Sequence, residues 1–77
     1  MNDAKERVQV ELDNLVQNIT KLMAFTFTEK YTKLSKRMQE LLKDQLFTMM
    51  SYAQCLRDRL NIWDMTNEEI DKMYTIQ

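Results

Sequence analysis

The amino-acid sequence predicts an all-α protein: an antiparallel helical hairpin followed by a short third helix at the C-terminus. The 77 residues include no glycine and no proline, which are the residues that most often shape tight turns and interrupt helices. Apolar residues recur every three or four positions along two long stretches, the spacing of one buried helix face. We therefore expect a single domain over residues 1–77, with helices at about 4–25, 36–62 and 67–76.

The first predicted helix carries one continuous apolar stripe. Asp3 is suited to cap it, and Glu6 three residues later completes a capping-box pattern. Polar residues fill the other side, so we expect the stripe to pack against another helix. The residues of the stripe, at steps of four, four, three, four and three, are Ala4, Val8, Leu12, Leu15, Ile19 and Leu22.

The segment from Phe25 to Ser35 interrupts the helical pattern. It holds three aromatic residues and three threonines, which have low helix propensity, and hydroxyl side chains can cap helices. We predict a turn here, with room for one short helical turn, and a second long helix that starts after Ser35.

The second long helix is predicted to carry two apolar strips, which favours packing against a helix of its own chain and a helix of another chain. At 1.5 Å per residue it is about 40 Å long. The expected inner seam is Met38, Leu42, Gln45, Met49, Tyr52, Leu56, Arg59 and Trp63, and the second strip is Leu41, Leu46, Met50, Ala53 and Leu60.

The C-terminal segment contains a capping box. Thr66 and Glu69 stand three residues apart, and Met65 before the cap can pack against Ile70. A short helix at 67–76 follows, with Ile70, Met73 and Tyr74 on one face.

Self-association is expected because a core in a chain below ~80 residues is marginal without staples. Cys55 is the single cysteine and there is no histidine, so neither a disulfide within the chain nor a zinc site is available. We predict a homodimer or a homotetramer.

Composition also excludes several classes of function. Without histidine the chain lacks the usual general base and metal ligand, so we expect no enzyme, no catalytic residue, no metal and no cofactor. A net charge of −1 argues against binding duplex nucleic acid, which favours a basic excess. No apolar run approaches ~20 residues and the first residues do not form a signal peptide, so we expect no membrane contact and a cytoplasmic location.

Gln45, Tyr52 and Arg59 are unusual because they lie seven residues apart on the predicted inner seam, where leucine would pack better. One interpretation is that they fix the register of an interface, as buried polar residues do in coiled coils. The other is a hydrated groove in which Tyr52 stacks on a planar ring, Arg59 binds an anion and Gln45 contacts a base edge.

The turn offers a second group of candidates, Lys30, Tyr31 and Lys33, with more cations following. Aromatic and basic residues together suit base stacking and phosphate binding. The alternative is a solvated helix start. Cations are unfavourable at a helix N-terminus, and a bound anion would relieve this.

The spacing of several residues between Lys5 and Leu60 resembles a family of small helical proteins of tailed bacteriophages, defined by relation to a crAss-like phage protein. Gln45, Tyr52 and Arg59 are the most specific part of the pattern, and residues 62–77 lie outside it. The matching positions are Arg7, Leu12, Leu15, Leu22, Phe25, Tyr31, Leu34, Leu41, Leu42, Gln45, Leu46, Tyr52, Leu56, Arg59 and Leu60.

This resemblance implies a counter-defence protein in the cytoplasm of the infected bacterial host. One such class is the anti-CBASS sponge, a helical homo-oligomer that sequesters cyclic di- or trinucleotide messengers without cleaving them. Its site would use Lys30, Tyr31, Lys33, Gln45, Tyr52 and Arg59. The alternatives are a protein-binding inhibitor of a host defence complex, similar to an anti-CRISPR, and a structural or regulatory phage protein.

Overall fold

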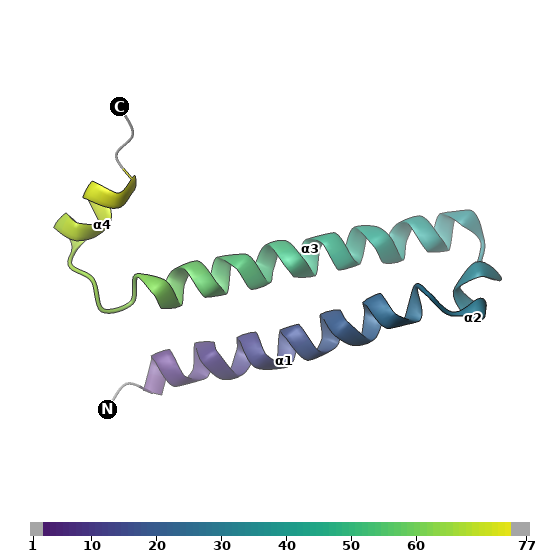
Figure 1. Ribbon diagram of the computed structural model, residues 1–77, viewed down its shortest axis with the longest axis horizontal. Helices are drawn as coiled ribbons and strands as arrows, with labels where there is room; N and C mark the ends of the chain where they lie inside the picture. Colours follow the sequence, from purple (N-terminus) through teal and green to yellow (C-terminus); the bar gives the residue numbers. More distant parts are fainter. Residues whose placement is uncertain (1–2, 75–77) are drawn as a thin grey trace.

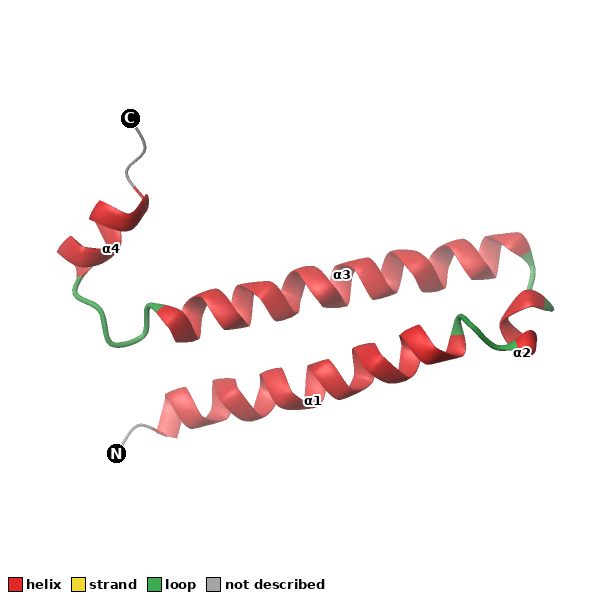
Figure 2. Cartoon of the chain, in the orientation of Figure 1, coloured by secondary structure: helices red, strands yellow, loops and turns green. Residues whose placement is uncertain are grey.

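The computed structural model describes residues 3–74, and within that range every regular element is a helix (Figures 1 and 2). The elements are α1 (Asp3–Phe25), α2 (Glu29–Thr32), α3 (Lys36–Asn61) and α4 (Asn67–Tyr74). The all-α prediction is confirmed. The two long helices begin and end within one residue of the expected positions, and the last residues of the predicted 67–76 helix lie outside the described part of the chain.

The helices α1 and α3 run antiparallel, side by side, and α2 joins them at one end (Figure 1). Their shared core is small: Val8 and Leu12 from α1 meet Ala53 and Leu56 from α3. Leu56 is fully buried. Half-buried apolar residues surround this core, namely Leu15, Val16, Ile19, Leu60 and Trp63.

Hydroxyl caps build the turn between the two long helices. The Thr28 hydroxyl accepts a hydrogen bond from the Tyr31 amide at 3.3 Å, and the Ser35 hydroxyl accepts one from the Met38 amide at 3.1 Å. Because no described residue has a positive φ, the turn requires no glycine.

Tyr31 anchors this turn. It is 5% exposed, and its ring meets Phe25 edge-on with 6.1 Å between ring centroids. Its hydroxyl donates a hydrogen bond to the Gln39 carbonyl at 3.1 Å. The aromatic residues of the turn therefore include a structural pair that fixes α2 against the start of α3.

The predicted capping box begins α4. The Thr66 amide donates to the Glu69 carboxylate at 2.8 Å, and the Glu69 amide donates to the Thr66 hydroxyl at 3.1 Å. A salt bridge of 2.8 Å between Lys5 and Asp64 ties the loop before α4 to the start of α1. From there α4 points away from the hairpin (Figure 1).

The predicted inner seam of α3 is wrong at its polar positions. Gln45, Tyr52 and Arg59 are exposed, whereas Ala53 from the second strip is 1% exposed and faces the core with Leu56. The physical reason is that a two-helix pair buries only a narrow stripe, and a small residue such as Ala53 lets the backbones approach. The polar side chains then lie at the edge of the contact, where water solvates them.

None of the helices among residues 3–74 is long and apolar enough to span a bilayer.

Candidate ligand-binding groove

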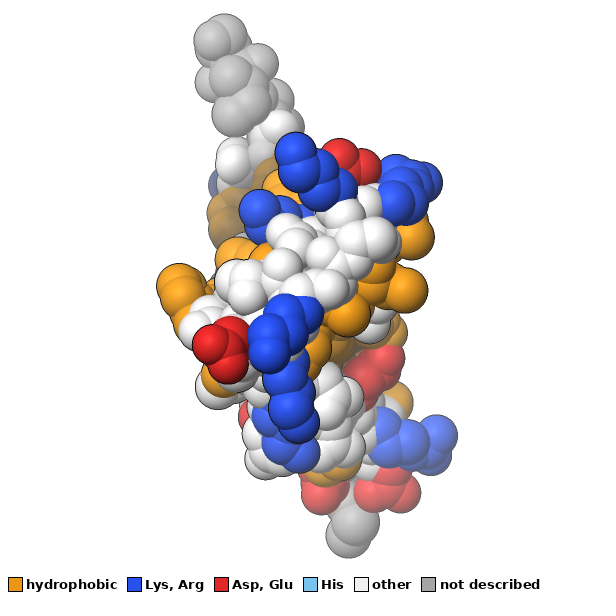
Figure 3. Space-filling model, turned by 90° about the vertical axis from the view of Figure 1, so that its right-hand side faces the viewer, with side chains coloured by type: hydrophobic (Ala, Val, Ile, Leu, Met, Phe, Trp, Pro, Cys, Tyr) orange, Lys and Arg blue, Asp and Glu red, His pale blue; other side chains and the backbone are white. Residues whose placement is uncertain are grey.

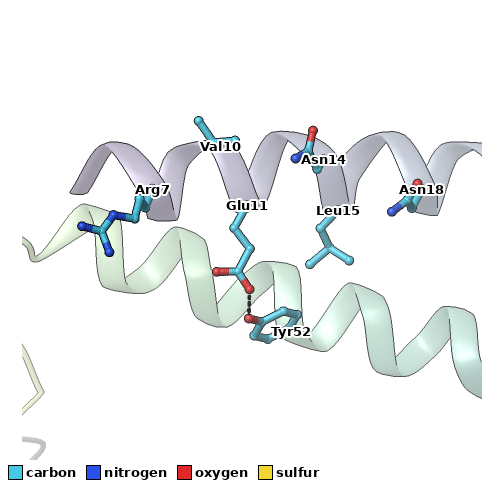
Figure 4. Close-up of a pocket in the computed structure, with 7 residues that line it drawn as sticks. All are labelled: Arg7, Val10, Glu11, Asn14, Leu15, Asn18 and Tyr52. Atoms are coloured by element: carbon cyan, nitrogen blue, oxygen red, sulfur yellow. Dashed lines mark hydrogen bonds between the residues drawn. The ribbon is translucent and has the colours of Figure 1, made fainter. Parts of the chain in front are cut away.

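A groove of about 460 Å³ runs along one edge of the hairpin, where α1 and α3 meet (Figure 4). Its volume falls in the usual range of small-ligand sites, about 300–1,000 Å³. Six of its lining residues come from α1 and one from α3. They are Arg7, Val10, Glu11, Asn14, Leu15, Asn18 and Tyr52.

A polar strip on α1 forms most of the groove. Arg7, Glu11, Asn14 and Asn18 follow one another at steps of four, three and four, so they lie along one side of the helix, beside the apolar stripe that packs on α3. In Figure 4 the Arg7, Glu11 and Leu15 side chains point toward α3, and Asn14 points away from it.

Tyr52 is the aromatic residue of the groove and it is held in place from across the hairpin. Its hydroxyl donates a hydrogen bond to the Glu11 carboxylate (Figure 4). This bond raises the pKa of Tyr52 above its usual value, because the carboxylate favours the protonated phenol. The ring remains 45% exposed, so a fixed aromatic surface is available at the edge of the hairpin.

The chemistry of the groove suits a planar, anionic ligand. A tyrosine ring stacks on bases of any sequence, and asparagine amides pair with the donor and acceptor edges of adenine. A guanidinium such as that of Arg7 binds phosphate in bidentate geometry. Arg7, Asn18 and Tyr52 line the same groove, with Leu15 contributing apolar surface, whereas the Asn14 side chain points away from α3 (Figure 4).

Arg59 and Gln45 extend this edge of the hairpin in opposite directions from Tyr52. The Glu11–Tyr52 contact sets the antiparallel register of α1 and α3. Seven residues after Tyr52, Arg59 is level with the start of α1. Seven residues before Tyr52, Gln45 is level with Asn18. The positive charge of Arg59 lowers the pKa of Tyr52, against the larger effect of Glu11, which puts the two side chains within electrostatic reach.

The structure does not bring the turn candidates to this groove. Lys30, Tyr31 and Lys33 belong to α2 and the residue after it, at the closed end of the hairpin. Tyr31 is buried and presents no open ring face for stacking. Lys33 forms an ion pair with Glu29 at 3.9 Å. Figure 3, viewed from this end, shows Lys and Arg side chains standing out over the near surface.

Sequence reasoning missed the contribution of α1 to the site. The apolar spacing predicts only that Glu11, Asn14 and Asn18 lie on the polar side of the first helix, and it does not join them to Arg7 or Tyr52. The signal that identifies them is their helical spacing beside the apolar stripe together with their type: an arginine, an acid and two amides on one line.

Two comparisons with known proteins place the chain among phage proteins. The Sequestin family model matches residues 2–62, a range that takes in α1, α2 and α3 and leaves α4 outside. The chain is 41% identical over 54 residues to the "Uncharacterized 7.5 kDa protein in denB-rIIB intergenic region" of Enterobacteria phage T4. The aligned residues cover 70% of this chain and 84% of the relative. No solved structure matches. The expected kinship with small phage proteins is thereby confirmed, and the chain belongs to the Sequestin family.

Proposed function

We propose that this protein binds cyclic oligonucleotide immune messengers in the cytoplasm of the infected bacterium and sequesters them without cleaving them. The family name suggests sequestration, and the T4 relative supports a phage origin. The observation that carries the choice of ligand is the exposed Tyr52 ring, fixed by Glu11 and bordered by Arg7 and two asparagine amides.

In this proposal the groove holds one base and its phosphate. The base stacks on Tyr52, which is worth about 1–3 kcal/mol, and the amide of Asn18 selects its edge. Arg7 and Arg59 bind the phosphates from the open end of the hairpin. Because these groups are exposed at the edge of the hairpin, the site can bind one part of a cyclic molecule without enclosing the whole ligand.

The proposal includes no chemical step. The sequence contains no histidine, and Cys55 therefore has no imidazole to activate it as a nucleophile. Sequestration needs only a dissociation constant below the cellular concentration of the ligand, and a protein concentration at least equal to that of the ligand.

Thermal unfolding with a panel of cyclic di- and trinucleotides tests this function. A true ligand at about 1,000 times its dissociation constant stabilises the protein by about 4 kcal/mol, which is a shift of several degrees or more for a domain of this size. The same ligand should stabilise the Tyr74→Ala variant as much as the wild type and stabilise Tyr52→Ala by about 1–3 kcal/mol less. A panel in which no cyclic nucleotide shifts the wild type rejects the proposed ligand class.

A further inference from the structure

The closed end of the hairpin carries a charged surface that the groove does not use. Residues 26–40, which include α2 and the start of α3, contain four cations and two acids, a net charge of +2. The rest of the chain contains seven cations and ten acids, a net charge of −3. Figure 3 looks onto this end and shows Lys and Arg side chains standing out over it. Residues 26–40, here called the basic end, therefore attract an anionic partner although the chain as a whole is slightly acidic.

Phe27 is the exposed aromatic residue of the basic end. Its side chain is 85% exposed, more than any other large apolar side chain among residues 3–74. Its amide donates a hydrogen bond to the Ala24 carbonyl at 3.1 Å, and the Thr28 amide donates one to the Phe25 carbonyl at 3.0 Å. The Thr28 hydroxyl also donates to the Phe25 carbonyl, at 2.7 Å. The backbone on both sides of Phe27 is thus fixed, so the turn holds an apolar ring in water at a set position.

The cations of the basic end are available to an anion. Lys33 and Arg37 each form an ion pair with a neighbouring acid, at 3.9 Å and 3.4 Å, and exposed pairs of this kind contribute little. Lys30 and Lys36 form no ion pair with any residue in the range 3–74. Lys36 is also the first residue of α3, where the helix dipole disfavours a cation. A bound phosphate would relieve this cost.

We propose that the basic end binds single-stranded nucleic acid. The Phe27 ring stacks on one base, and the four cations bind phosphates of the same strand. Aromatic rings beside cations bind single strands of any sequence, because every base has a flat face. The bases of a duplex are already stacked on one another, so a duplex offers the basic end its phosphates alone.

A single strand suits the basic end better than an anionic membrane does. Tyr31 is 5% exposed and packs edge-on against Phe25, so Phe27 is the one freely exposed aromatic ring among residues 25–40. Binding to a membrane surface scales with the apolar area that is buried, and one ring supplies little of it. A base stack, in contrast, needs one ring.

Fluorescence anisotropy with a labelled oligothymidine strand of about 12 nucleotides, within the usual site sizes for single strands, tests this surface. The wild type should bind the strand, and Phe27→Ala should bind it about 5- to 150-fold more weakly, the fold-change of one lost base stack. Tyr74→Ala removes an exposed ring from α4 and should bind as the wild type does, with unchanged helical circular dichroism in both variants. A wild type that does not bind the strand overturns the proposal, and so does a Phe27→Ala variant that binds it as tightly as the wild type.

The salt dependence of the affinity tests the cations. Each phosphate contact to a single strand contributes about −0.7 to the slope of the logarithm of the binding constant against that of the salt concentration, so Lys30→Gln combined with Lys36→Gln should make the slope less steep by about 1.4. Arg57→Gln combined with Lys72→Gln removes the same charge outside the basic end and should leave the slope unchanged. Equal slopes in the wild type and in the Lys30→Gln, Lys36→Gln variant would reject the phosphate contacts.

Three further measurements separate this surface from other partners and from the groove. A duplex of the same length should bind several-fold more weakly than the single strand, and equal affinities would reject base stacking on Phe27. Vesicles of phosphatidylglycerol and phosphatidylcholine should leave the strand bound; vesicles that displace it would assign the basic end to a membrane and overturn the proposal. Tyr52→Ala should keep the affinity of the wild type for the strand, and a loss of that affinity would place the strand in the groove and reject a separate site.

Discussion

Tyr52 combines exposure with a fixed orientation, because Glu11 on the opposite helix accepts a hydrogen bond from its hydroxyl. The ring and the hydroxyl therefore have separable roles. Tyr52→Ala should weaken ligand binding by about 1–3 kcal/mol, roughly 5- to 150-fold. Tyr52→Phe keeps the ring and should lose less. Titration calorimetry measures both, with Tyr74→Ala as the matched control, and equal losses for Ala and Phe would contradict a stacking role.

The same hydrogen bond predicts a pH dependence. The pKa of Tyr52 is raised in the folded protein, so the stabilisation from the neutral phenol is fully present below its unfolded pKa of about 10. It is lost as the pH rises through the folded pKa. Alkaline titration followed by tyrosinate absorbance should show one late-titrating tyrosine that becomes earlier in Glu11→Gln. A Glu11→Gln titration identical to the wild type would contradict this account.

Arg59 distinguishes the groove from a register device. The Arg59 side chain lies on an exposed edge, within electrostatic reach of Tyr52. Arg59→Ala should therefore weaken the binding of an anionic ligand and leave the oligomeric mass unchanged. Arg57 is two residues away and therefore on another side of the helix, where it lines a depression with Asp13, so Arg57→Ala is the control. The ligand affinity and the oligomeric mass of each variant are measured on one preparation. Intact binding with broken assembly in Arg59→Ala would reject the groove.

At the scale of helices, stability depends on the few buried contacts between α1 and α3. Leu56 is fully buried, and Leu56→Ala should cost about 2–5 kcal/mol. Chemical denaturation with helical circular dichroism as the signal measures this cost. Leu41→Ala truncates a leucine of the same helix that is 44% exposed and should cost clearly less. A similar loss in both variants would mean that the core lies elsewhere.

The helices themselves were predictable because each has a local cause. Apolar residues that recur every three or four positions predict α1 and α3. The hydroxyl residues Thr28, Ser35 and Thr66 mark the starts of α2, α3 and α4. The rotation of α3 was not predictable from spacing, since two apolar strips both qualify as the buried one. The buried face takes Leu56 from one strip and Ala53 from the other, so it lies between the two.

At the scale of the whole molecule, the site arises from two helices that only the fold brings together. Tyr52 was identifiable from the sequence as an odd residue in an apolar pattern, but its partners on α1 were not, because Glu11 is 41 positions away. Tyr31 was a candidate for another reason, as an aromatic residue among cations, and it is a buried anchor. Tyr52 and Tyr31 differ in where each ring lies relative to the neighbouring helix. The spacing of residues in the sequence does not give this position.

Equilibrium dialysis is the most direct test of sequestration. A mixture of cyclic di- and trinucleotides is equilibrated across a membrane with the protein on one side, and the protein chamber is heat-denatured and analysed by mass spectrometry. We expect at least one cyclic nucleotide to accumulate with the protein and to be recovered at its original mass. Tyr52→Ala should reduce the excess, and Tyr74→Ala should retain it. Equal concentrations on both sides, or recovery of a linear product, would contradict sequestration.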